Sequence, residues 1–135
     1  MDAIPDFAKK FNVSVLVGDV IIALPYGDEY ENDSNWGLVY NTKNKEYTYF
    51  DIGLNFGGKY RYRCGMSYNG LAVFFPTGTP TCPILVIDTA GNIVKHQLVT
   101  NSLLGRPVLF NGKIVTIAYD FDKKENYLFT LDLEW

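Results

Sequence analysis

The residues best suited to bind a ligand in this 135-residue chain are its arginines. Arg61, Arg63 and Arg106 lie in connections between apolar segments, whereas the lysines are scattered along the chain. A guanidinium group presents a rigid set of donors that matches a carboxylate or a phosphate. Tyr60 and Tyr62 alternate with Arg61 and Arg63, so this segment also offers aromatic rings. We therefore predict a binding site for an anionic small molecule, such as a nucleotide or a phosphorylated metabolite.

A structural role for the arginines is the alternative. Acidic side chains of a neighbouring loop, such as Asp28, Glu29 or Glu31, could pair with them. Strict alternation along a strand would also place the two arginines and the two tyrosines of the segment 60–63 on opposite faces. The sequence leaves both interpretations open.

The loop 27–35 is the other concentration of polar groups, with the sequence GDEYENDSN. Its oxygens do not follow the spacing of a calcium loop, so a solvated loop is the expected interpretation. Asp28, Tyr30, Glu31 and Trp36 form a candidate interaction surface, because aromatic rings beside acids can hold a basic partner or a sugar. The alternative functions are therefore a protein-interaction module with a basic partner and a carbohydrate-binding lectin.

Catalysis and metal binding have little support in the sequence. His96 is the only histidine, and no nucleophile, phosphate-loop or dinucleotide motif occurs. Cys64 and Cys82 lack the spacing of a metal site, so we expect reduced thiols, no metal and no cofactor. A hydrolase that uses only carboxylates stays open, but a non-catalytic binding protein for sequestration or sensing is the preferred prediction.

Composition limits the class of protein. The chain is 47% hydrophobic, 16% aromatic and 20% charged, which is too apolar for a disordered chain. A net charge of -3 argues against nucleic acid or an anionic membrane as a partner. No apolar run is long enough to span a membrane and no signal peptide is evident, so we expect one cytoplasmic domain.

Short β-strands are the elements expected to position these residues. Val, Ile, Thr, Tyr and Phe fill brief apolar runs that are separated by turn-forming sequences. The predicted strands are 13–17, 20–24, 37–40, 46–51, 60–64, 71–75, 84–88, 93–100, 107–110, 113–119 and 127–131. A helical turn is considered only at 5–11, so the predicted fold class is all-β.

Three segments of the chain repeat one pattern. VLVGDVIIALPYG, MSYNGLAVFFPTG and VLFNGKIVTIAYD begin at residues 15, 66 and 108 and align without gaps. Each contains a two-residue Gly-Asp or Asn-Gly turn between apolar strands, which is a strong hairpin signal. A third strand follows each hairpin and ends in Asn41, Asp88 or Asp132, and the first two units add a tight turn and a fourth strand.

Four strands in about 40–50 residues are typical of a β-propeller blade. NGKI at 111–114 and LVYNTKNKEYT at 38–48 resemble parts of the kelch repeat, with Tyr47 where that repeat has tryptophan. The Gly-Gly doublet of the kelch repeat is replaced here by other residues. The resemblance implies a propeller fold and no particular function, and a β-sandwich of meandering hairpins is the alternative.

The predicted units are an N-terminal arm at 1–12, blades at 13–59 and 60–105, and a partial third blade at 106–135. Three blades cannot close a ring of about 4–8 blades, so we expect two copies to form a six-bladed homodimer. Residues 2–7 of one copy would complete the third blade of the other. The longer connections would gather on one face of this ring, where the arginines would surround the channel.

Overall fold

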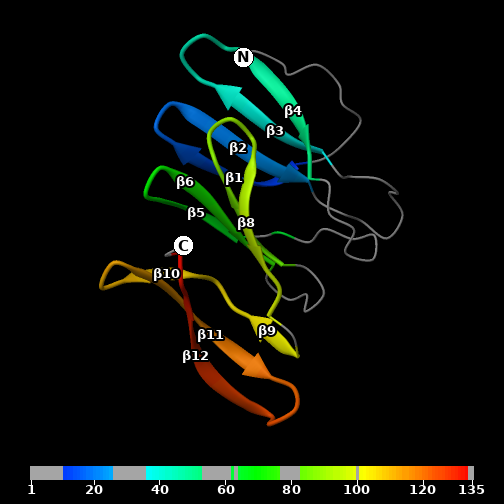
Figure 1. Cartoon of the computed structure of the whole chain (residues 1–135), viewed down its shortest axis with the longest axis vertical. Coiled ribbons are helices and arrows are strands. Elements are labelled where there is room, and N and C mark those ends of the chain that lie inside the picture. Colours follow the sequence, from blue (N-terminus) through cyan, green and yellow to red (C-terminus); the bar gives the residue numbers. More distant parts are fainter. Residues whose placement is uncertain are drawn as a thin grey trace.

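The structure is a computed structural model that describes residues 11–25, 36–52, 62, 64–76, 83–99 and 101–133. Within these ranges twelve strands form three four-stranded antiparallel sheets, and no helix occurs (Figure 1). The predicted all-β fold is confirmed. The predicted helical turn at 5–11, apart from Phe11 in the first strand, and the proposed exchanging strand at 2–7 lie outside the described residues.

The first two sheets are simple meanders. Sheet 1 contains β1 (Phe11–Val17), β2 (Val20–Pro25), β3 (Trp36–Asn41) and β4 (Tyr47–Asp51). Sheet 2 contains β5 (Cys64–Tyr68), β6 (Leu71–Phe75), β7 (Ile84–Ile87) and β8 (Ile93–Gln97). In both sheets the strands are hydrogen-bonded in chain order, as the sequence repeat predicts.

Sheet 3 differs because its first strand is interrupted. It contains β9 (Ser102–Leu104), β10 (Val108–Phe110), β11 (Lys113–Asp120) and β12 (Glu125–Leu131). β12 pairs along one edge of β11, and β9 and β10 pair with the two halves of the other edge. Sheet 3 is therefore three strands wide, in agreement with a third unit that lacks a fourth strand.

Two predicted strands differ from the structure by three or more residues at one or both ends, and β9 was not predicted. β5 begins at Cys64, so the strand predicted at 60–64 is displaced, and Tyr62 is not in a strand. β8 ends at Gln97, whereas the prediction extends to residue 100. Both errors come from apolar residues that enter the core from connections, where alternation along a strand does not apply.

The hairpin turns have the backbone conformation that their sequences require. Asn69 and Gly70 have φ of 50° and 77°, and Asn111 and Gly112 have φ of 51° and 74°. Positive φ at both central residues matches the twist of the flanking strands, and Asn and Gly adopt it readily. These two Asn-Gly turns therefore hold β5 with β6 and β10 with β11.

Turn-forming side chains also explain two of the aligned polar residues. The Oδ1 atom of Asn41 accepts hydrogen bonds from the backbone amides of Lys43 and Asn44, at 2.9 and 3.3 Å. The Oδ1 atom of Asp88 accepts from the amides of Ala90 and Asn92, at 3.0 and 2.8 Å. Such side chains stabilise tight turns, so Asn41 and Asp88 have a structural role between the third and fourth strands.

Sheet 2 is packed between sheets 1 and 3 (Figure 1). One buried cluster joins sheets 1 and 2 and includes Val15, Ile22 and Phe74. The other joins sheets 2 and 3 and includes Phe75 and Ile114. Neighbouring residues of β6 thus enter different clusters, which explains why β6 and β7 are apolar throughout.

The contact between sheets 1 and 2 depends on a glycine. A Cβ atom on Gly65 would lie 2.6 Å from Cγ2 of Val15 and 2.9 Å from Cδ1 of Phe74. Because real Cβ atoms do not approach so closely, only glycine fits here without movement of the neighbours.

The three sheets do not close into a ring within the described part of the chain.

Candidate functional site

The structure describes two of the five residues predicted to bind an anion. These are Tyr62 and Arg106, while Tyr60, Arg61 and Arg63 lie outside the described residues.

Tyr62 is a core residue. Its side chain is 0% exposed and belongs to the cluster between sheets 1 and 2. Its hydroxyl donates a hydrogen bond to the carbonyl oxygen of Pro83 at 2.5 Å. Tyr62 therefore anchors the segment before β5, and its ring is not accessible to a ligand.

Arg106 lies between β9 and β10, the two strands that pair with the same edge of β11. The amide of Gly105 donates to the carbonyl of Ile117 at 3.1 Å. The hydroxyl of Thr116, a residue that is 3% exposed, donates to the carbonyl of Arg106 at 2.9 Å. These bonds hold the backbone of the interruption in place.

The side chain of Arg106 is exposed. Among the residues that the structure describes, no carboxylate forms an ion pair with its guanidinium group. The acids of the alternative interpretation, Asp28, Glu29 and Glu31, lie outside the described residues, so pairing of Arg106 with one of them stays a prediction.

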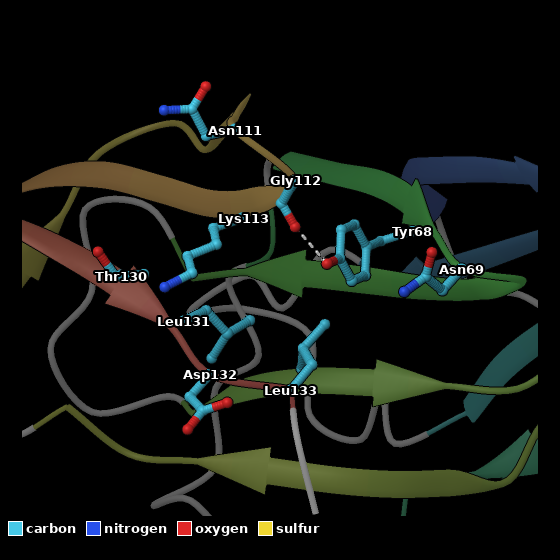
Figure 2. Close-up of a pocket in the computed structure, with 9 residues that line it drawn as sticks. All are labelled: Tyr68, Asn69, Asn111, Gly112, Lys113, Thr130, Leu131, Asp132 and Leu133. Atoms are coloured by element: carbon cyan, nitrogen blue, oxygen red, sulfur yellow. Dashed lines mark hydrogen bonds between the residues drawn. The ribbon is translucent and has the colours of Figure 1, made fainter.

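A pocket of about 490 Å³ opens between sheets 2 and 3 (Figure 2). The two Asn-Gly turns form part of its lining, and the end of β12 forms another part. The full lining consists of Tyr68, Asn69, Asn111, Gly112, Lys113, Thr130, Leu131, Asp132 and Leu133. The pocket is therefore at the end of the sheets with the short turns, whereas the sequence analysis favoured the end with the longer connections.

A hydrogen bond connects the two sheets in the pocket wall. The hydroxyl of Tyr68, at the end of β5, donates to the carbonyl oxygen of Gly112 in the turn after β10 (Figure 2). Leu131 is 4% exposed and contributes to the cluster between these sheets. The pocket thus has one apolar wall from the core and a polar rim from the turns.

Lys113 and Asp132 are the charged residues of the lining. Lys113, at the start of β11, is exposed, and its ammonium group has no ion pair among the described residues. The backbone carbonyl of Asp132 accepts a hydrogen bond from the ammonium group of Lys95 at 2.5 Å. Figure 2 shows the carboxylate of Asp132 directed away from Lys113. The lining therefore includes the ammonium group of Lys113 together with the amide side chains of Asn69 and Asn111, which Figure 2 shows at separate places around the rim.

The predicted interaction loop is described only at its end. Asp28, Tyr30 and Glu31 lie outside the described residues. Trp36 is the first residue of β3, pairs in register with Asp51 of β4 and is 39% exposed. The structure thus leaves part of the indole accessible.

The other residues considered for chemistry are dispersed. His96 is exposed on β8, Cys64 is a half-buried free thiol, and Cys82 lies outside the described residues. In the described ranges, no group of three or more His, Cys, Asp and Glu side chains could hold a metal ion. No helix in these ranges has the length and apolar character needed to cross a membrane.

The comparisons with known proteins assign no family to the chain. No protein-family model matches the sequence, and a search of curated proteins finds no significant match. The resemblance to the kelch repeat therefore depends on the sequence pattern alone.

The sequence analysis did not identify Lys113 or Tyr68 as site residues. A usable signal was present, because the second and third repeats carry Asn-Gly turns at aligned positions. Stacking of consecutive units brings such turns together at one end. A pocket between them, lined by the residues next to each turn, could have been predicted on that basis.

Proposed function

We propose that this chain is a non-catalytic binding protein for an anionic small molecule, such as a nucleotide or a phosphorylated metabolite. The observation that carries the proposal is the pocket between sheets 2 and 3, with the available ammonium group of Lys113 in its lining. Ligand pockets typically measure about 300–1,000 Å³. The pocket volume of about 490 Å³ suits one small molecule.

The lining supplies contacts for the anionic group of such a ligand and for its apolar or planar part. Lys113 would bind a phosphate or a carboxylate through charge-assisted hydrogen bonds. The amide groups of Asn69 and Asn111 would add neutral donors at the rim, while Leu131 and Leu133 would contact an apolar or planar part. The ligand would be held without turnover, which suits sequestration or sensing.

The same proposal includes a larger assembly. The three sheets would be kelch-like propeller blades, closed into a six-bladed cytoplasmic ring by a second copy. The edge of β12 has no strand partner among the described residues, so it could accept residues 2–7 of the other copy. Arg106 lies between β9 and β10, and with Arg61, Arg63 and the neighbouring Tyr60 it would form a second anion-binding rim.

Thermal unfolding with a panel of phosphate, nucleotides, sugar phosphates and neutral glycans tests the proposal. An anion from the panel should raise the melting temperature of the wild-type protein. Lys113→Gln should reduce that shift, and Arg106→Ala should reduce it as well if the arginine rim contributes. Lys43→Gln is the matched control, because Lys43 is an exposed lysine that pairs with Asp19 far from the pocket. The absence of a shift with every anion would contradict the proposal.

A lectin is the second candidate, favoured by one observation. Tyr68, Asn69, Asn111 and Thr130 give the pocket many uncharged polar groups. Such groups can hydrogen-bond to sugar hydroxyls. A thermal shift with a neutral glycan that survives Lys113→Gln would favour this function over anion binding.

A protein-interaction module is the third candidate. The partial exposure of Trp36 supports it, and Asp28, Tyr30 and Glu31 would complete the surface for a basic partner. Trp36→Ala should then weaken binding to a basic peptide while the response to anions stays unchanged.

A further inference from the structure

The outer face of sheet 3, which points away from sheet 2, carries exposed apolar side chains. Ile114 and Ala118 of β11 are buried in the cluster between sheets 2 and 3. Since successive side chains alternate, Ile117 points to the opposite face. Ile117 pairs in register with Leu128 of β12, and the two residues are 58% and 63% exposed.

The inner strand extends this apolar face. Val108 pairs in register with Val115, which is itself buried at 8% exposure, and Phe110 pairs with Lys113, which also lines the pocket at the turn end. Val108 and Phe110 are 57% and 62% exposed. Clusters of large apolar side chains that are exposed to this extent mark interaction surfaces.

The outer face of sheet 1, which points away from sheet 2, also carries a row of apolar and aromatic side chains. Leu16, Ile21, Tyr40 and Tyr47 are paired in register across the four strands. Their neighbours, such as Val15 and Val39, are buried in the cluster with sheet 2, so the row lies on the other face. Leu16 is 58% exposed and Tyr47 is 38% exposed, whereas Ala23 and Leu38 on the same face are buried, so the exposed row lies at the turn end of this face.

The two faces form the opposite ends of the stack (Figure 1). An antiparallel sheet with one solvated face normally has polar residues on that face. Both end faces instead carry rows of apolar and aromatic residues, although the face of sheet 3 also includes the exposed residues Lys113, Asn126 and Thr130 near its ends. Each end therefore has the composition of a sheet that is covered by another sheet.

We propose that the outer face of sheet 3 packs on the outer face of sheet 1 of a second copy, and that this contact forms twice in a two-fold dimer. The inference rests on the ring assembly proposed above, and it does not depend on the ligand. Face-to-face packing of this kind already occurs within the chain, because sheet 2 packs between sheets 1 and 3.

Interface area favours a second copy that makes both contacts. A strand spacing near 4.8 Å and a rise near 3.3 Å per residue give these sheets faces of roughly 300–400 Å². One contact would bury roughly 600–800 Å², which is less than the roughly 1,000 Å² expected of a stable interface. Two contacts in a closed dimer would bury roughly 1,200–1,600 Å², within the range of stable complexes.

Light scattering and sedimentation equilibrium of the full chain test the inference. The wild-type protein should be a dimer at micromolar concentration. Leu16→Lys and Leu128→Lys should each weaken dimerisation about 100-fold, because each variant buries an unpaired charge in both contacts. Val94→Lys is the matched control, since Val94 is 45% exposed on β8 of the central sheet and should leave the dimer intact.

Mixing the two variants identifies the faces that meet. In a mixed dimer both lysines fall in one contact, and the other contact joins two unaltered faces. The mixture should therefore associate about 10-fold more tightly than either variant alone. Circular dichroism of each variant should match the wild-type spectrum.

A wild-type chain that remains monomeric at high micromolar concentration would overturn the inference, whatever the variants do. A dimer that dissociates with Leu128→Lys alone would also overturn it, because two copies of sheet 3 would then meet. Anion binding is measured separately on the monomeric variants, since the Lys113 pocket lies within one chain. Loss of the dimer and loss of ligand binding are thus distinguishable.

Discussion

Tyr62 illustrates how a single residue can be misassigned when its surroundings are unknown. Alternation with Arg61 and Arg63 suggested an aromatic wall for a ligand. In the structure the ring is 0% exposed and the hydroxyl is bonded to Pro83. Burial of this side chain follows from packing between two sheets, which no local pattern in the sequence contains.

Tyr62→Phe is expected to destabilise the protein without affecting a ligand. Removal of the hydroxyl leaves the buried carbonyl of Pro83 without this donor, which costs about 1–2 kcal/mol. Urea unfolding should show this loss, and the affinity for the anion found in the panel should remain at the wild-type value. Ser67→Ala is the control, because it removes a hydroxyl from an exposed position and its change should be close to neutral. If Tyr62→Phe lowered the affinity for the anion without lowering the free energy of unfolding, Tyr62 would be a binding residue and the structural role would be wrong.

At the scale of the element, the hairpins were predictable and the interruption of sheet 3 was not. The Asn-Gly turns at 69–70 and 111–112 dictate their own backbone, so β6, β10 and β11 followed from local sequence, whereas β5 was predicted at 60–64 and begins at Cys64. The separation of β9 from β10 depends on the buried hydroxyl of Thr116, which bonds to the carbonyl of Arg106. The pocket was missed for a similar reason, because its lining combines two sheets.

The close contact of β1 with β5 predicts that a larger residue in place of Gly65 destabilises the protein. Gly65→Ala would place a Cβ atom 2.6 Å from Val15 and 2.9 Å from Phe74, so these side chains must shift. Overpacking of this kind costs about 1–3 kcal/mol. Urea unfolding should show a loss in this range, whereas Ser67→Ala, at an exposed position of the same strand, should change stability by less than about 0.5 kcal/mol. Equal stability of the two variants would show that the sheets do not approach in this way.

At the scale of the whole molecule, the repeat predicted three sheets in chain order, and the structure stacks them with sheet 2 in the centre. The sequence could predict this because each unit contains its own hairpins and turns. The relation between consecutive sheets could not be read in the same way, since it depends on long-range packing. The stack places two Asn-Gly turns beside one pocket and leaves an apolar face at each end.

Calorimetric titration with pyrophosphate tests the central claim, that the pocket between sheets 2 and 3 binds an anion. The wild-type protein and the Lys43→Gln control should bind pyrophosphate with equal affinity. Lys113→Gln should bind it roughly 10- to 150-fold more weakly, because a charge-assisted hydrogen bond of about 1.5–3 kcal/mol is lost. Equal affinity of the wild-type protein and the Lys113→Gln variant, or no binding by the wild-type protein, would contradict the claim.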